Sequence, residues 1–111
     1  MNPLKYNHLG IPTASQRPGE RYLPQFRMYV SGSDESDFRI EWMRFEAGCP
    51  LPEIVRTLPH VAFEVDDLSE ALRGRKVIIE PNSPSAGVLV AFIEDNGAPI
   101  ELMQFGPDCL V

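Results

Sequence analysis

The 111-residue chain has few cysteines and fewer basic than acidic residues. Its two cysteines, Cys49 and Cys109, are too few for a disulfide framework and lack the close spacing of a zinc knuckle, so we expect free thiols. The 10 Lys and Arg residues are outnumbered by 16 Asp and Glu residues, which gives a formal net charge of −6. This sign of charge argues against nucleic acid or an anionic membrane surface as a partner.

Long apolar segments are also missing. The longest purely apolar run covers only residues 88–93, whereas a membrane-spanning helix needs roughly 20 residues. The first residues contain no apolar stretch typical of a signal peptide, so we expect a cytoplasmic protein. The length predicts a single domain over residues 1–111, because two independent cores would not fit.

A short motif occurs twice in the chain. Residues 40–45 read Ile-Glu-Trp-Met-Arg-Phe and residues 100–105 read Ile-Glu-Leu-Met-Gln-Phe, so four of the six positions match. A histidine precedes each copy, His8 in the first half and His60 in the second, and these are the only two histidines. Each Glu is followed eight residues later by a cysteine. The same order of His, Glu and Cys in both halves indicates a duplicated unit.

The second half has the pattern of a complete unit. Residues 60–65 predict a strand, and a short helix follows, with Asp67 as its N-cap and Gly74 at its end. Three further strands are predicted, and a tight turn at residues 95–97 joins the last two. These strands cover residues 76–80, 88–94 and 99–105.

The first half has a similar predicted pattern of strands but lacks a full helix. A strand is predicted at residues 6–12 and a hairpin from residues 26–30 and 38–46. Pro18, Gly19 and Pro24 argue against a full helix between residues 14 and 24, so we expect a loop with at most one helical turn. Module one is therefore predicted at about residues 4–47, the connector at about 48–57 and module two at about 58–106.

The histidines and the repeated glutamates have informative neighbours. Because side chains alternate along a strand, each histidine shares a strand face with small or polar residues, whereas Glu41 and Glu101 share theirs with Met and Phe. A carboxylate buried beside apolar side chains is costly unless it is compensated. Two imidazoles and a divalent metal ion would compensate both carboxylates.

This arrangement resembles the vicinal oxygen chelate superfamily, which contains glyoxalase I, the bleomycin resistance proteins and the extradiol dioxygenases. The resemblance covers about residues 4–106 and is strongest over residues 60–67 and 99–103. It implies an α+β fold in which two βαβββ-type modules, the first with its helix shortened or lost, form a curved, cup-shaped and mostly antiparallel sheet. It also implies a homodimer and metal ligands at four positions, namely His8, Glu41, His60 and Glu101.

Two nitrogen and two carboxylate ligands are compatible with Zn, Ni, Fe, Co or Mn. The resemblance favours a metal-dependent lyase or isomerase of the glyoxalase or epimerase type, in which the divalent metal stabilises an enediolate or enolate of a small carbonyl substrate. Glu41 or Glu101 is then the catalytic base, and Glu64, on the same strand face as His60, is a weaker candidate.

Two alternatives stay open. A non-catalytic protein of the resistance type would bind a small molecule in an apolar cup without a metal, and an extradiol-type dioxygenase is disfavoured because the chain has no third histidine. Each His or Glu taken alone also fits an ordinary structural role. Arg17, Arg21 and Arg27 are either solvated loop residues or an edge that binds a carboxylate or phosphate.

Overall fold

The computed structural model describes residues 3–107, and its strands form one eight-stranded mixed sheet. The first half contributes β1 (Lys5–Pro12), β2 (Arg21–Leu23), β3 (Met28–Ser31) and β4 (Ile40–Phe45). The second half contributes β5 (His60–Glu64), β6 (Lys76–Ser85), β7 (Val88–Asp95) and β8 (Ala98–Phe105). The helices are short: η1 (Ser33–Glu35), α1 (Glu53–Thr57) and α2 (Leu68–Leu72).

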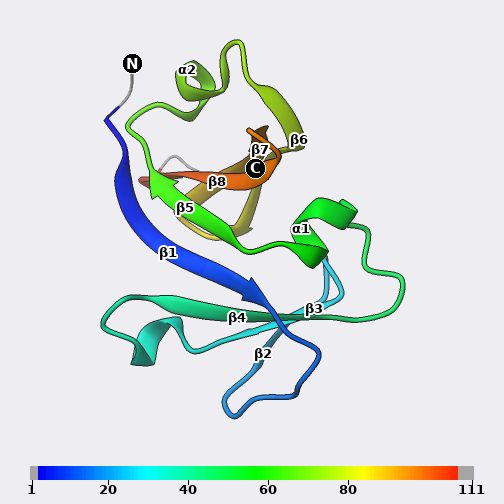
Figure 1. Ribbon diagram of the computed structural model, residues 1–111. Coiled ribbons are helices and arrows are strands. Elements are labelled where there is room, and N and C mark those ends of the chain that lie inside the picture. The colour runs from blue at the N-terminus through cyan, green and yellow to red at the C-terminus, as the bar shows by residue number, and fades with distance from the viewer. Residues whose placement is uncertain (1–2, 108–111) are drawn as a thin grey trace.

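The strand order shows the duplication directly. The order is β2-β3-β4-β1-β5-β8-β7-β6, so each half repeats the same sequence of strands outward from the centre. β1 pairs in parallel with β4, β5 pairs in parallel with β8, and the antiparallel pair β1–β5 joins the halves. The sheet curls around this central pair (Figure 1). The predicted α+β fold with a curved, cup-shaped and mostly antiparallel sheet is confirmed.

The outer face of the second half is covered by α2. Asp67 caps this helix by accepting a hydrogen bond from the Glu70 backbone N–H, and Gly74 follows its end at φ 75°, as predicted. The helix packs on the apolar outer face of the sheet. The buried residues of this cluster are Val65, Leu68, Ala91, Ile93 and Leu102.

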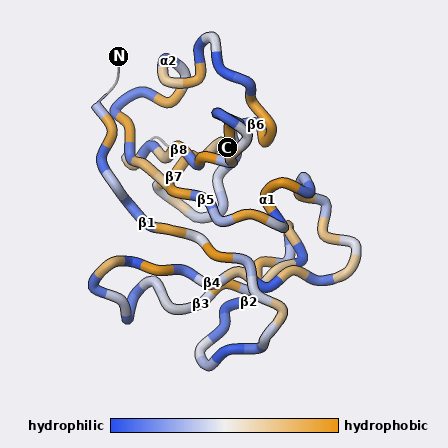
Figure 2. The backbone as a smooth tube through the Cα atoms, viewed as in Figure 1, coloured by the Kyte–Doolittle hydropathy of each residue, from blue (hydrophilic) through white to orange (hydrophobic). Residues whose placement is uncertain are grey.

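The outer face of the first half has no such helix, and residues 13–20 form a loop instead. The guanidinium of Arg17 lies 4.5 Å from the centre of the Trp42 ring, and Glu20 pairs with Arg44 through two hydrogen bonds of 2.7 and 2.8 Å. The expected loss of the first helix is therefore confirmed. Figure 2 shows this loop as largely hydrophilic and α1 as hydrophobic.

Some predicted boundaries were wrong. β2 lies within residues 14–24, where only a loop was expected, because a three-residue edge strand carries no alternating pattern. β6 continues through Pro81 and Pro84 to Ser85, although a stop at residue 80 was expected. An edge strand tolerates proline because its outward N–H groups need no partner.

The inner face of the first half has its own apolar cluster. Met28, Val30 and Met43 are buried there, and Leu51 packs beside them. The unexpected helix α1 in the connector buries Val55, whose side chain also faces the inside of the cup. Within residues 3–107, no helix is long and apolar enough to cross a membrane.

Candidate metal centre

The strand registers bring the four predicted ligands to the middle of the inner face. Across β1 and β5, His8 lies opposite Ala62 and His60 lies opposite Gly10. In the parallel pairs, Glu101 is the partner of Ala62 and Glu41 is the partner of Gly10. Each half thus contributes one His and one Glu at equivalent positions.

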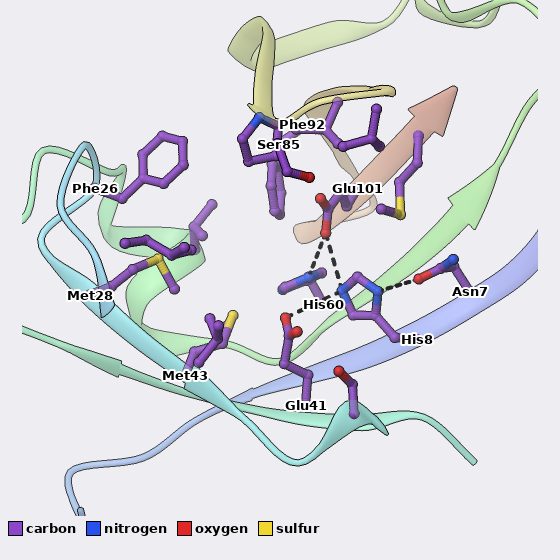
Figure 3. A pocket seen from close by; sticks show the side chains of 18 of the residues that line it. Asn7, His8, Phe26, Met28, Glu41, Met43, His60, Ser85, Phe92 and Glu101 are labelled. Carbon is purple, nitrogen blue, oxygen red and sulfur yellow. Dashed lines mark hydrogen bonds and ion pairs between the residues drawn. The ribbon is translucent and has the colours of Figure 1, made fainter. Parts of the chain in front are cut away.

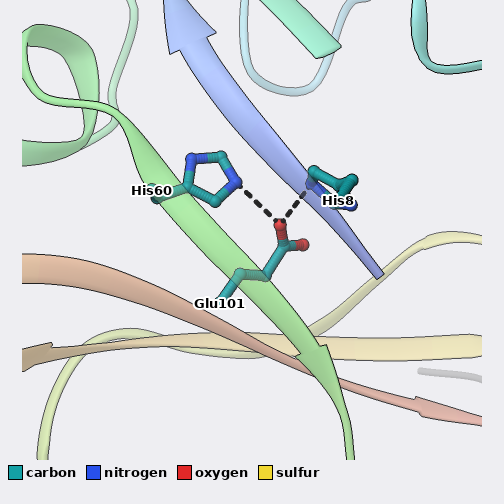
Figure 4. Close-up of side chains that lie close together, drawn as sticks. All are labelled: His8, His60 and Glu101. Atoms are coloured by element: carbon teal, nitrogen blue, oxygen red, sulfur yellow. Dashed lines mark hydrogen bonds and ion pairs between the residues drawn. The ribbon is translucent and has the colours of Figure 1, made fainter. Parts of the chain in front are cut away.

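Three of these side chains form a tight buried group. Glu101 Oε1 lies 3.0 Å from His60 Nε2 and 3.2 Å from His8 Nε2, so both imidazoles approach the same oxygen (Figure 4). The three residues retain only 2 to 8% of their accessible surface. Their ligand atoms lie within 4.8 Å of one another, so the group could hold a metal ion.

The fourth predicted ligand lies close by but outside the tight group. Glu41 Oε1 is 3.7 Å from His8 Nε2, and the carboxylate is partly exposed (Figure 3). Gly10 separates Glu41 from His60 in the sheet. A Cβ atom on Gly10 would lie 2.3 Å from His60 Cε1, so the imidazole packs directly on the glycine backbone. The two halves are therefore not equivalent at the level of side chains.

Asn7, which no sequence pattern indicated as a site residue, holds His8 in one orientation. The pairing of β1 with β5 is irregular between Tyr6 and His8, so both Asn7 and His8 are buried and line the cup. Asn7 Nδ2 donates to Glu64 Oε2 at 2.9 Å, and the Asn7 Oδ1 atom lies 2.6 Å from His8 Nδ1. Strict alternation placed Asn7 on the opposite face, and nothing in its sequence context signals a bulge.

These contacts determine which nitrogen of His8 faces the centre. Because a carboxylate only accepts hydrogen bonds, Glu64 fixes the amide of Asn7 with its oxygen toward His8. The Nδ1 atom of His8 therefore donates, and its Nε2 atom faces the two glutamates. Metal-binding histidines commonly have such an acceptor behind them. The Glu64 carboxylate, the weaker candidate for the base, accepts the hydrogen bond from Asn7 and so has a structural partner.

The glutamates differ in their ionisation. Burial by itself would raise the pKa of Glu101, but the hydrogen bond from His60 and the contact with His8 outweigh burial and lower the pKa to about 2. Burial raises the pKa of Glu41 above 4.5, against the opposing charge of His8. Burial alone would lower the pKa of His8, but Glu101 and Glu41 raise it above 6.5. The Glu101 carboxylate therefore resists protonation, whereas the Glu41 carboxylate takes up a proton more easily.

The donor set fits a metal ion. His8 Nε2, which faces the centre, is buried without a hydrogen bond among the described residues. Buried nitrogen atoms of this kind are uncommon, and an ion or ligand in the site would offset their cost. Two imidazoles with one or two carboxylates suit a divalent transition metal.

The centre opens into a cavity of about 320 Å³. Figure 3 shows the His and Glu side chains on one side of this space and Phe26, Met28 and Met43 on the other. Most of the wall is apolar. Further apolar residues of the lining include Val88, Val90, Phe92, Met103 and Phe105.

The three arginines considered as an anion-binding edge lie in different places. Arg21 lines the cavity, but Arg17 stacks on Trp42 and Arg27 packs beside Gly48. Arg39, which the sequence analysis did not single out, also lines the cavity. Its position follows from the turn before β4, which no local pattern predicted.

The one cysteine among residues 3–107 lies away from the centre. Cys49 is a partly buried free thiol and does not line the cavity. Cys109, its counterpart in the repeat, lies outside the described residues.

Comparison with known proteins supports the fold. No family model matches the chain, and no curated protein sequence matches it. The structure is similar to the crystal structure of hypothetical protein BH1468 from Bacillus halodurans C-125, with a TM-score of 0.66 and 21% sequence identity over 95% of each chain. This similarity extends along nearly the whole chain and concerns the fold alone.

Proposed function

We propose that this chain is a metal-dependent lyase or isomerase of the glyoxalase or epimerase type and a member of the vicinal oxygen chelate superfamily. The observation that carries the proposal is the approach of His8 Nε2 and His60 Nε2 to the same oxygen of Glu101, at 3.2 and 3.0 Å. A buried carboxylate needs such partners, and two imidazole nitrogens that meet at one carboxylate oxygen are typical of a metal-binding donor set. Zn, Ni, Fe, Co and Mn all suit these ligands.

The two glutamates have different proposed roles. A divalent ion, when bound, supplies Lewis-acid stabilisation of negative charge on a carbonyl oxygen. Glu101 is the ligand, because its pKa of about 2 makes it a weak base. Glu41 lies beside this group, has a raised pKa, and faces the cavity, so it is the proposed base that removes a proton next to the carbonyl group. Glu41 also completes the ligand set when no substrate is present.

The first test is the metal content of untagged protein purified without chelator, measured by inductively coupled plasma mass spectrometry. We expect near-stoichiometric Zn, Ni, Fe, Co or Mn in the unaltered protein. His8→Ala, His60→Ala and Glu101→Gln should each lower the occupancy, because each removes one member of the buried group. Glu80→Gln is the matched control, since Glu80 is exposed on β6. A protein that stays metal-free after incubation with these ions contradicts the proposal.

The second test asks for proton transfer. Small 2-oxo compounds are incubated with the metal-loaded protein in D₂O, and loss of the C–H signal next to the carbonyl group is followed by NMR. We expect Glu41→Gln to slow exchange by about 10²-fold or more while metal remains bound. Equal exchange rates in Glu41→Gln and Glu80→Gln would remove Glu41 from the role of base.

A non-catalytic binding protein is the second candidate, and the largely apolar cavity favours it. In that case a metal-free protein would bind apolar ligands with full affinity, and no proton exchange would occur. The extradiol-type dioxygenase ranks last because the chain offers only two histidines. The cytoplasmic location is proposed from the composition alone.

A further inference from the structure

The cavity has two positively charged side chains at its lining. Arg21 belongs to β2, and Arg39 precedes β4, so both come from the first half of the chain. Both residues are exposed, and both line the same cavity as the metal centre. The charge of Arg21 acts on Glu41, and the charge of Arg39 acts on His8. Both arginines therefore belong to the half of the sheet that also carries His8 and Glu41.

These two guanidinium groups are not used in structural ion pairs. Among residues 3–107, the Arg–carboxylate pairs within 4.0 Å involve Arg44, Arg73 and Arg75, and neither Arg21 nor Arg39 takes part in one. Arg44, in contrast, is held by Glu20 on the outer face. Two unpaired guanidinium groups at a partly apolar cavity are available to bind an oxyanion, for which their planar donor geometry is well suited.

The backbone at Arg39 gives a further indication. Arg39 has φ 56°, a left-handed conformation that is uncommon for a residue other than glycine. Its carbonyl accepts from the Leu9 N–H and its own N–H donates to Ser36 O, so the strained position is held by the sheet and the turn. These two hydrogen bonds fix the backbone of Arg39 beside β1, next to the cavity that its side chain lines.

The remaining lining limits what else the ligand contains. Phe26, Met28 and Met43 form an apolar wall across the cavity from the His and Glu side chains (Figure 3). A ligand that contacts both the arginines and this wall needs one charged end and one apolar end. The cavity of about 320 Å³ has room for a compound of roughly the size of a substituted aromatic acid.

We propose that the ligand of this site is a small carbonyl compound with an oxyanion, a carboxylate or a phosphate, bound by Arg21 and Arg39, and with an apolar body against Phe26 and Met28. This inference names the substrate class of the proposed metal site and rests on that function. Arg21 and Arg39 are positioning residues that select a charged over a neutral compound.

The test compares three probes with the same benzyl group: phenylacetate, benzylphosphonate and the neutral phenylacetamide. Their affinities are measured by ligand-observed NMR titration with the full chain. Because an anion also binds a divalent ion directly, each titration is done both on metal-loaded protein and after chelation. We expect at least one of the two anions to bind about tenfold or more tightly than the amide in the chelated protein. The preferred anion distinguishes carboxylate from phosphate.

Three variants assign the effect to the arginines. Arg21→Gln and Arg39→Gln should each weaken binding of the preferred anion by about tenfold and leave phenylacetamide unchanged. Arg17→Gln is the matched control, since Arg17 stacks on Trp42 outside the cavity. Equal affinity for acid and amide, or an anion affinity that Arg21→Gln and Arg39→Gln both leave unchanged, would overturn the inference.

The metal content of the same samples separates the two proposals. A protein that binds metal but shows no preference for anions retains the proposed metal site and loses the substrate class. A protein that binds no metal but prefers anions through Arg21 and Arg39 loses the metal-dependent function and retains the anion site. Both readouts come from one preparation, so neither failure can be taken for the other.

Discussion

The bulge at Asn7 turns two neighbouring side chains toward the same space. The His8 Nδ1 atom donates to Asn7, and the Asn7 amide in turn donates to Glu64. This chain of contacts keeps the His8 Nε2 atom directed at Glu101 without further cost in side-chain entropy when an ion binds. A single amide thus determines both the tautomer and the orientation of one candidate ligand.

Replacing Asn7 tests this role. Asn7→Ala leaves His8 Nδ1 and Glu64 without their partner, so we expect metal affinity to fall by about 10- to 100-fold while the fold is kept. Affinity is measured by competition with a chromophoric chelator. Asn82→Ala is the control, because Asn82 also lines the cavity but donates to the backbone carbonyl of Glu80. An equal affinity in both variants would show that Asn7 does not position His8.

The ionisation of Glu101 predicts how the metal-free protein responds to acid. Its pKa is lowered from 4.5 to about 2 in the folded state, so the carboxylate stabilises the fold at pH values above 4.5. That contribution is lost as the pH falls from 4.5 toward 2. We expect the free energy of unfolding, measured with urea on chelated protein, to decrease over this range.

The matched variants identify the group. Glu101→Gln should have a shallower decrease than the unaltered protein, because one fewer proton is taken up on unfolding. Glu80→Gln should keep the full slope, since Glu80 is exposed. The opposite sign holds for His8: its pKa is raised above 6.5, so its contribution is present below pH 6.5 and is lost as the pH rises through the folded value. Parallel slopes for Glu101→Gln and the unaltered protein would contradict the assignment.

The two closing strands, β4 and β8, explain why the repeated motif is only partly conserved between the halves. Three of the four matching positions, Glu, Met and Phe, belong to the inner face, where both halves meet the cavity, and the fourth, Ile, lies on the outer face. The positions that differ belong to the outer face. There, Trp42 stacks with Arg17 of the loop, whereas Leu102 packs in the cluster under α2.

The other position that differs between the two copies, 44 in the first half and 104 in the second, also contacts what covers the outer face. Gln104 Oε1 accepts from the Leu68 N–H at the start of α2, and the corresponding Arg44 binds Glu20 of the loop. The motif has therefore diverged where one half is covered by a helix and the other by a loop. The inner face has kept its residues, as the proposed site requires.

The central strand pair makes its own prediction. Gly10 faces His60 across β1 and β5, and a Cβ atom there would lie 2.3 Å from the imidazole. We expect Gly10→Ala to lower the free energy of unfolding by about 1–3 kcal/mol and to reduce metal occupancy, because His60 must move. Urea unfolding and metal analysis check the two effects.

A double variant separates steric conflict from other damage. In Gly10→Ala/His60→Ala the clashing imidazole is gone, so the loss of stability should be smaller than the sum of the two single losses, although metal stays absent. Additive losses would mean that Gly10 matters for a reason other than its contact with His60.

The molecule as a whole leaves apolar side chains exposed near its central strands. Phe38 is 76% exposed and Tyr6 is 45% exposed, and the Tyr6 hydroxyl donates to the Phe38 carbonyl, so the two lie side by side. Leu4, 55% exposed, is two residues from Tyr6. We call these three residues the exposed apolar patch. Such a patch is typical of a surface that binds another protein.

We propose that this patch forms part of the interface of the homodimer that the family resemblance implies. We expect light scattering after size exclusion to give about twice the 12.5 kDa chain mass. Phe38→Ser should weaken self-association by about tenfold or more, because one large exposed side chain can dominate an interface. Leu58→Ser is the control, since Leu58 is 41% exposed before β5 and lies outside the patch. A monomeric protein at high concentration would contradict the homodimer.

Much of the molecule follows from the sequence by itself. The paired histidines and glutamates, the duplicated strands and the Asp67 cap of α2 were predicted from local spacing. Local rules suffice there because strand alternation and helix capping depend on residues only a few positions apart. The loss of the first helix followed in the same way from Pro18 and Gly19.

The tertiary structure alone decided the details of the candidate site. The bulge that turns Asn7 inward, the 3.7 Å offset of Glu41 from His8 and the entry of Arg39 into the cavity depend on pairing between strands far apart in the chain. The register of such pairs is set by the packing of whole faces and by irregularities that shift one residue, and neither leaves a signal at short sequence spacing. The sequence therefore determined which residues are candidates, and the curvature and register of the sheet determined which of them meet.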